Sequence, residues 1–150
     1  MIAIYLAIIF FVGLDRFLKI LALTDQGRQF NLIGEILKFE FKTNYYIAFS
    51  LPLAGQALTA LIFFIIIILI WLGLYCYRHK EYFRLGSLSL IVLGAGSNLF
   101  DRARYGPVVD YLDLKYFTVF NLADVMIVIG VMLLIVASCK KEARQALLQK

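Results

Sequence analysis

Four long apolar stretches, separated by short polar segments, dominate the pattern of the chain. Each stretch is close to the length of about 20 residues that a helix needs to cross the hydrocarbon core of a bilayer. We therefore expect an all-α membrane protein with four transmembrane helices over residues 1–23, 53–77, 83–100 and 119–139. Because no linker or repeat interrupts this pattern, residues 1–150 are predicted to form a single integral membrane domain.

The two longer polar segments, residues 24–52 and 101–118, are predicted to be outer loops. Within the first, residues 37–42 read Leu-Lys-Phe-Glu-Phe-Lys, an alternation with the period of a β-strand. We expect a small extracytoplasmic β-sheet here, between the first and second helices, lying on the membrane surface with its aromatic side chains toward the lipid. After the third stretch, Gly106 and Pro107 are expected to break the helix and turn the chain back.

The composition is typical of a membrane protein, with 63% hydrophobic and 17% charged residues. The net charge of +5 comes from short segments, because residues 78–84 carry three Lys or Arg against one acid and residues 140–150 carry four against one. Segments 25–52 and 101–116 are each balanced at three against three. By the positive-inside rule, both termini are predicted to be cytoplasmic. The chain has no basic stripe with interleaved aromatic residues, so we expect no nucleic-acid partner.

Acidic and amide side chains gather between the third and fourth apolar stretches. Three residues share one face of the third helix, at positions i, i+4 and i+7: Gly94, Asn98 and Asp101. Asn121 and Asp124 lie at i and i+3 where the last stretch begins. With a turn between the two helices, Asp110 and Asp124 are predicted to meet at one membrane surface. Ionisable groups at the edge of a membrane span usually mark function.

Two neighbouring carboxylates cannot both ionise without cost, so one keeps a proton while the other is ionised. The ionised group can take a proton from water, and the protonated group can polarise a peptide carbonyl. Such a pair hydrolyses peptide bonds without a metal or cofactor. Structural interpretations remain open, with Asp124 as a helix N-terminal acid beside an Asn121 cap and Asp110 as a solvated loop residue.

Three motifs in this part of the chain resemble those of lipoprotein signal peptidases (signal peptidase II). The family signature has the approximate form G-A-x-x-N-x-x-D-R, then V-V-D-[FY], then F-N-[LIV]-A-D. The corresponding residues here are 94–102, 108–111 and 120–124. The resemblance extends over all four apolar stretches and both outer loops, and it is weakest for residues 24–47.

The resemblance implies an aspartic endopeptidase that removes the signal peptide from diacylglyceryl-modified bacterial prolipoproteins, cutting before the lipidated cysteine. Asp110 and Asp124 are then the catalytic pair, with no metal and no cofactor. The expected partners are the prolipoprotein and membrane lipid. The enzyme is expected to be a monomer in the bacterial cytoplasmic (inner) membrane, with its active site at the extracytoplasmic face. The residues expected to bind substrate are Asn44, Asn98, Arg102 and Asn121, and those expected to support the site are Asp15, Lys19, Asp101 and Gly94.

Four residues depart from the family pattern. Tyr46 and Ile47 stand where the family motif N-x-G-A-A-F-S has small residues, which implies a narrower substrate groove and an altered substrate preference. Arg16 replaces the Gln that usually follows Asp15. Ser97 stands where a glycine is frequent, and a serine is expected to be tolerated there.

Two other functions fit parts of the pattern. A small proton-coupled transporter also uses intramembrane acids, but it predicts acids deeper in the bilayer and broken, repeated helices. An inactive peptidase-like scaffold predicts the loss of one of the two aspartates, and both are present. Structural interpretations also remain for Asn44 as a turn residue and for Asp15 and Lys19 as an i, i+4 ion pair.

Overall fold

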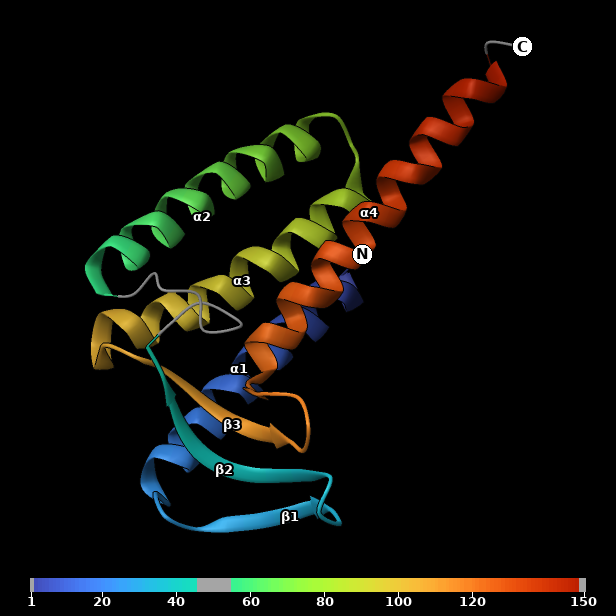
Figure 1. Cartoon of the computed structure of the whole chain (residues 1–150). Coiled ribbons are helices and arrows are strands. Elements are labelled where there is room, and N and C mark those ends of the chain that lie inside the picture. The colour runs from blue at the N-terminus through green and yellow to red at the C-terminus, as the bar shows by residue number, and fades with distance from the viewer. Residues whose placement is uncertain (1, 46–54, 149–150) are drawn as a thin grey trace.

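Four helices form the body of the molecule. The structure is a computed structural model and describes residues 2–45 and 55–148. The helices are α1 (Ile2–Thr24), α2 (Gly55–Arg78), α3 (Tyr82–Tyr105) and α4 (Leu122–Leu148). Figure 1 shows α3 in the centre, with α2 packed along one side of it and with α1 and α4 along the other.

Three of the described helices are long and apolar enough to cross a membrane, at residues 55–78, 82–105 and 122–140. The helix α1 has a similar length of 23 residues, but it carries Asp15, Arg16 and Lys19 in its second half. Such residues are strongly unfavourable in hydrocarbon unless they face protein. Three of the four predicted spans are therefore confirmed as candidates, and the span formed by α1 stays a prediction.

The helix α3 is longer at its outer end than predicted. The apolar pattern stops at Phe100, but the helix continues to Tyr105. It ends at Gly106, which has a φ of 92° and donates its N–H to Arg102 O (3.2 Å). This left-handed backbone conformation carries no Cβ penalty in glycine. The predicted break is confirmed, whereas the predicted end at residue 100 was wrong. The apolar pattern stops there, but the helix continues through the buried Asp101 and the exposed Arg104.

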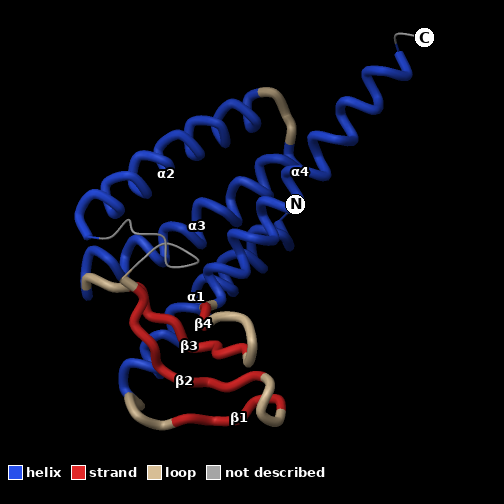
Figure 2. Tube along the Cα trace, viewed as in Figure 1, coloured by secondary structure: helices blue, strands red, loops and turns tan. Residues whose placement is uncertain are grey.

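A four-stranded antiparallel sheet lies at one end of the helices (Figure 2). Its strands, in spatial order, are β1 (Gln29–Ile33), β2 (Leu37–Asn44), β3 (Val108–Leu114) and β4 (Val119–Phe120). The strands β1 and β2 lie between α1 and α2, as predicted. The strand β3 lies within residues 101–118, and β4 occupies the first two residues of the predicted span 119–139; no strand was predicted in either segment. The acids at positions 110 and 113 interrupt the apolar residues of β3 and hide its pattern.

The apolar face of the sheet packs on the end of α1. Phe39 of β2 is buried together with Ala22 of α1 and with Val109 and Tyr111 of β3. The rings of Phe39 and Tyr111 lie 5.5 Å apart between centroids. The expectation that this aromatic side chain faces lipid was therefore wrong, because helix and neighbouring strand supply a protein surface that buries it.

A β-bulge shapes the end of β2 that approaches the helices. Phe39 lies opposite Leu112, whereas Lys42 lies opposite Asp110, so β2 has one residue more than β3 between the two pairs. Bulges are frequent beside active sites because they re-aim side chains. The pairing continues to Asn44, opposite Val108, which places the Asn44 side chain beside Asp110.

Candidate active site

Asp110 and Asp124 are brought together through a shared neighbour, Asn121. Asp110 lies on β3 and Asp124 in the first turn of α4. The Asn121 side-chain Nδ2 donates a hydrogen bond to Asp110 Oδ1 (2.7 Å), and its backbone N–H donates to Asp124 Oδ2 (3.1 Å). One residue thus holds both carboxylates, and the two acids lie together, as predicted. Their position at a membrane surface stays a prediction.

Asn121 also caps α4. Its side-chain Oδ1 accepts the backbone N–H of Asp124 (2.9 Å), while the Asp124 carboxylate accepts the backbone N–H of Asn121. This reciprocal arrangement is a capping box. The structural interpretation of Asp124 as a helix N-terminal acid is therefore correct. It does not exclude a chemical role, because each carboxylate oxygen has two lone pairs and Oδ2 uses one of them here.

Asp110 is almost completely enclosed, with 2% of its surface exposed. The side chain of Asn44 donates to Asp110 Oδ2 (3.0 Å), opposite the bond from Asn121. Burial, and then the nearby charge of Asp124, raise the pKa of Asp110 to about 7, although the bonds from Asn44 and Asn121 act to lower it. The interpretation of Asp110 as a solvated loop residue is thus wrong. This carboxyl can hold a proton near neutral pH.

Asn98 fixes the other carboxylate. Its Nδ2 donates to Asp124 Oδ1 (2.7 Å), and its Oδ1 accepts from Lys19 Nζ (2.7 Å) and from Asn121 Nδ2 (3.1 Å). Because a lysine ammonium can only donate, it obliges the Asn98 oxygen to face it. The amide hydrogen bond donor of Asn98 is therefore directed at Asp124.

A buried ion cluster lies behind Asn98. Lys19 has no exposed side-chain surface and lies 3.3 Å from Asp15 Oδ2 and 2.7 Å from Asp101 Oδ2. Arg16 Nη1 donates to Asp101 Oδ1 (2.6 Å) and to the backbone and hydroxyl oxygens of Ser97 (both 3.2 Å). Two carboxylates and two cations balance in charge, which makes burial of the cluster tolerable. Arg16 and Ser97, the two departures from the family pattern in this region, contact each other.

The start of α4 is held by residues from other elements. The Tyr111 hydroxyl accepts the backbone N–H of Leu122 (3.0 Å) and donates to Asp15 Oδ1 (3.0 Å), and the same Asp15 oxygen accepts the N–H of Ala123 (3.2 Å). Burial, and then the charge of Asp15, raise the pKa of Tyr111, so the hydroxyl remains a donor. The sequence pattern does not single out the hydroxyl of Tyr111, because a phenylalanine ring at this position would fit the same pattern.

Gly94 permits the close approach of α3 and α4. A Cβ at this position would lie 2.6 Å from the carbonyl oxygen of Ala123 and 3.0 Å from Ile127. A side chain of any size would therefore push away the turn that carries Asp124. The supporting role predicted for Gly94 would have this steric basis. The supporting role predicted for Asp15, Lys19 and Asp101 would be electrostatic, through the buried ion cluster.

The remaining predicted site residues are placed as follows. Arg102 is half-buried near the end of α3 and interacts electrostatically with Asp110 and Asp124. Asn44, Asn98 and Asn121 all bond to the two carboxylates or to each other. Tyr46 and Ile47 lie outside the described residues, so their expected effect on substrate preference stays a prediction.

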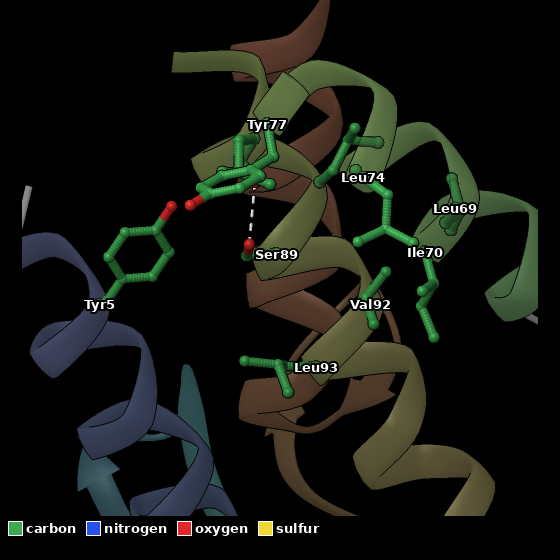
Figure 3. A pocket seen from close by; sticks show the side chains of 11 residues that line it. Tyr5, Leu69, Ile70, Leu74, Tyr77, Ser89, Val92 and Leu93 are labelled. Atoms are coloured by element: carbon green, nitrogen blue, oxygen red, sulfur yellow. Dashed lines mark hydrogen bonds between the residues drawn. The ribbon is translucent and has the colours of Figure 1, made fainter. Parts of the chain in front are cut away.

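A cavity of about 400 Å³ lies away from the carboxylates (Figure 3). Its walls come from the second half of α2, the first half of α3 and Tyr5 of α1, and they are apolar apart from the hydroxyls of Tyr5, Tyr77 and Ser89. Figure 3 shows the Tyr5 and Tyr77 hydroxyls pointing toward each other. The candidate site involves the second half of α3, so this cavity is not part of it.

The fold and the site define a helical membrane protein. Two carboxylates, both held by hydrogen bonds from Asn121, lie where its helices meet a small sheet. The model of one protein family, described as Signal peptidase (SPase) II, matches residues 7–140. The chain therefore belongs to the signal peptidase II family.

Relatives and solved structures agree with this assignment. The chain is 41% identical over 123 residues to a lipoprotein signal peptidase of Caldicellulosiruptor bescii, which covers 80% of this chain and 79% of the relative. It is 32% identical over 141 residues to that of Halothermothrix orenii, covering 93% and 97%. A bacterial membrane enzyme solved by the in meso method at 2.3 Å resolution is 29% identical and superposes with a TM-score of 0.81, covering 96% of this chain and 92% of that one.

Proposed function

We propose that this chain removes signal peptides from prolipoproteins as an aspartic endopeptidase, with Asp110 and Asp124 as the catalytic carboxylates. Membership of the signal peptidase II family supports the reaction. The observation that carries the assignment of residues is the bridge through Asn121, which binds one carboxylate with its side chain and the other with its backbone. These two acids are the ones in the second and third family motifs.

The chemistry divides between the two carboxylates. Asp124, ionised at the N-terminus of α4, takes a proton from the attacking water as the oxygen adds to the peptide carbonyl. Asp110, which is buried and protonated, gives its proton to the carbonyl oxygen. When the tetrahedral intermediate collapses, Asp124 passes its proton to the leaving amine and the hydroxyl proton returns to Asp110. The pair regains its starting state with one proton, and one water is consumed.

Hydrogen bonds prepare the pair for these transfers. Asn44 and Asn121 hold Asp110, and Asn98 holds Asp124, in the absence of substrate. We assign these amides first to orienting the acids, with substrate contacts formed by the same groups when a peptide enters. Arg102, beside both acids, is suited to bind a backbone carbonyl of the substrate.

The substrate is assigned as a prolipoprotein that carries diacylglycerol on its cysteine, with the cut immediately before that cysteine. A site between two candidate spans, α3 and α4, and a small sheet suits a peptide whose lipid stays in the bilayer. The enzyme is assigned as a monomer with four spans in the bacterial cytoplasmic membrane. Its termini are cytoplasmic and its site is extracytoplasmic. The transporter alternative requires acids deep in the bilayer, whereas Asp110 lies on a strand outside the candidate spans.

The substrate assignment is tested with purified protein in lipid nanodiscs. One prolipoprotein is supplied with and without the diacylglyceryl group, and the products are identified by mass spectrometry. The proposal predicts a single cut directly before the cysteine, in the lipid-modified substrate only. Equal cleavage of both forms, or a cut elsewhere, contradicts it.

A further inference from the structure

Two turns of the sheet expose apolar side chains next to each other. Ile33 ends β1 and Ile36 lies in the turn between β1 and β2, whereas Tyr116 and Phe117 lie in the turn between β3 and β4. We refer to these four residues as the turn patch. Tyr116 is 94% exposed, and the other three are 61%, 59% and 66% exposed in the order given. A group of exposed large apolar side chains marks a contact surface more often than an isolated one does.

The two turns form one continuous surface. The backbone N–H of Lys115 donates to Ile36 O (2.8 Å), and Leu37 pairs with Leu114 where the two turns begin. Lys115 Nζ also forms an ion pair with Glu35 Oε2 (2.8 Å). These are the charged residues of the two turns, and they neutralise each other. The surface is therefore apolar at its tips and has no net charge.

Along the direction of the helix axes, the turn patch lies near the first residues of α4. It does not lie at the outermost end of the sheet. The first turn of α4 lies beside Asn98, because Asn98 bonds to Asp124. From Asn98, α3 continues to Tyr105, about 10 Å further along its axis. The strand β3 then returns from this outer end, and the turn that follows it precedes α4 by only a few residues. Figure 1 shows both turns on the side of the sheet that lies nearest the start of α4.

We propose that the turn patch inserts into the interfacial layer of the bilayer that surrounds α4. The residues of α4 that are exposed and apolar, such as Val128, Ile129 and Met132, belong to a candidate span and face the hydrocarbon. The patch continues this lipid-facing surface toward the lipid headgroups, where aromatic side chains such as those of Tyr116 and Phe117 are favoured. A neutral surface continuous with a lipid-facing one fits lipid better than a soluble protein partner.

This contact has a consequence for the site. The strands between the two turns, β2 and β3, carry Asn44 and Asp110. Anchoring the turns in the bilayer fixes the height of these two residues relative to lipid. The inference needs only the membrane location of the protein and does not depend on the proposed chemistry.

The test uses the single tryptophan of the chain, Trp71, which is replaced first by Phe. Phe117→Trp then reports on the turn patch, and Arg28→Trp serves as the control, because it lies before β1 at the opposite end of that strand. Both proteins are reconstituted in nanodiscs whose lipids carry bromine near the top of the acyl chains. The proposal predicts blue-shifted emission and strong quenching for Phe117→Trp, and neither for Arg28→Trp.

The opposite result has a distinct signature. If Phe117→Trp emits at the same wavelength as Arg28→Trp and is quenched by aqueous iodide instead of by bromolipid, the patch faces water and the proposal is wrong. Ile36→Trp repeats the measurement on the other turn. Because Phe117, Ile36 and Arg28 are all exposed, these substitutions leave the packing of the sheet intact.

Discussion

At the scale of single residues, Asn121 organises the candidate site. Its side chain binds Asp110, its backbone binds Asp124, and its side-chain oxygen caps α4. Local helix capping and the placement of two acids therefore depend on one side chain. Structural and chemical roles coincide here because an N-cap position presents its backbone N–H and side chain in the same direction.

The proton on the acid pair predicts the pH dependence of cleavage. Burial, and then the charge of Asp124, raise the pKa of Asp110 to about 7, so the pair loses its remaining proton above neutral pH. The value of kcat/KM should therefore fall by about tenfold per pH unit well above pH 7. The measurement is a pH profile with a lipid-modified substrate. A profile that is flat to pH 9 contradicts the assignment of Asp110 as the proton donor.

The pH dependence of thermal stability tests the raised pKa of Asp110 without an activity assay. The carboxyl has a raised pKa in the folded protein, compared with about 3.9 when unfolded, so the folded state binds the proton more tightly. The contribution of the Asp110 carboxyl to the free energy of unfolding is then greatest below pH 4 and decreases as the pH rises toward 7. The decrease in Tm between pH 5 and pH 8 should be smaller in Asp110→Asn than in the wild type.

The Tyr111 hydroxyl makes a second prediction at this scale. Tyr111→Phe keeps the buried ring but leaves the N–H of Leu122 without its acceptor and removes one donor from Asp15. We expect a loss of about 1–3 kcal/mol in the free energy of unfolding. Because the start of α4 carries Asp124, kcat should fall more than KM changes. A variant with unchanged kcat contradicts this positioning role.

At the scale of elements, the sequence predicted the helices better than the sheet. Apolar stretches report helices that face lipid, so α2 and α4 were located to within a few residues, apart from the C-terminal extension of α4 beyond the membrane. At the end of α3 and in β3, the buried acids Asp101 and Asp110 pair with cations or amides, so hydropathy carries no signal for these segments. The two acids themselves were found from motif spacing. The amide network and Tyr111 depend on distances between segments that no local pattern encodes.

Packing between α3 and α4 gives a prediction with a matched control. In Gly94→Ala the new methyl group meets the Ala123 carbonyl at 2.6 Å, so the first turn of α4 must move. We expect destabilisation of about 1–3 kcal/mol and a marked loss of cleavage. Gly96→Ala is in the same helix with nothing within 4 Å of the new Cβ. It should retain activity and stability, and equal behaviour of the two variants would falsify the steric argument.

At the scale of the whole molecule, charge and site lie at opposite ends. The basic segment 78–84 lies at the junction of α2 and α3, and the basic segment 140–150 includes the last turns of α4. The carboxylate pair and the sheet lie at the other end of the helices. The positive-inside rule then orients the site toward the extracytoplasmic side. This orientation is a prediction from charge, independent of the site chemistry.

Cysteine labelling tests the orientation. In a Cys76→Ser, Cys139→Ser background, Arg28→Cys marks the sheet end and His79→Cys the turn between α2 and α3. A membrane-impermeant maleimide should label Arg28→Cys in intact spheroplasts and should label His79→Cys only after lysis. The reverse pattern contradicts the predicted topology.

The central claim is that Asp110 and Asp124 carry out peptide hydrolysis together. The most direct measurement is cleavage of a lipid-modified prolipoprotein by Asp110→Asn and Asp124→Asn, beside Asp113→Asn as a control from the same strand as Asp110 and only partly buried. We predict that Asp110→Asn and Asp124→Asn each lower the cleavage rate by about 10²–10⁴-fold, while Asp113→Asn cleaves like the wild type. Substantial cleavage by either Asp110→Asn or Asp124→Asn, in protein that is folded, would contradict the assignment.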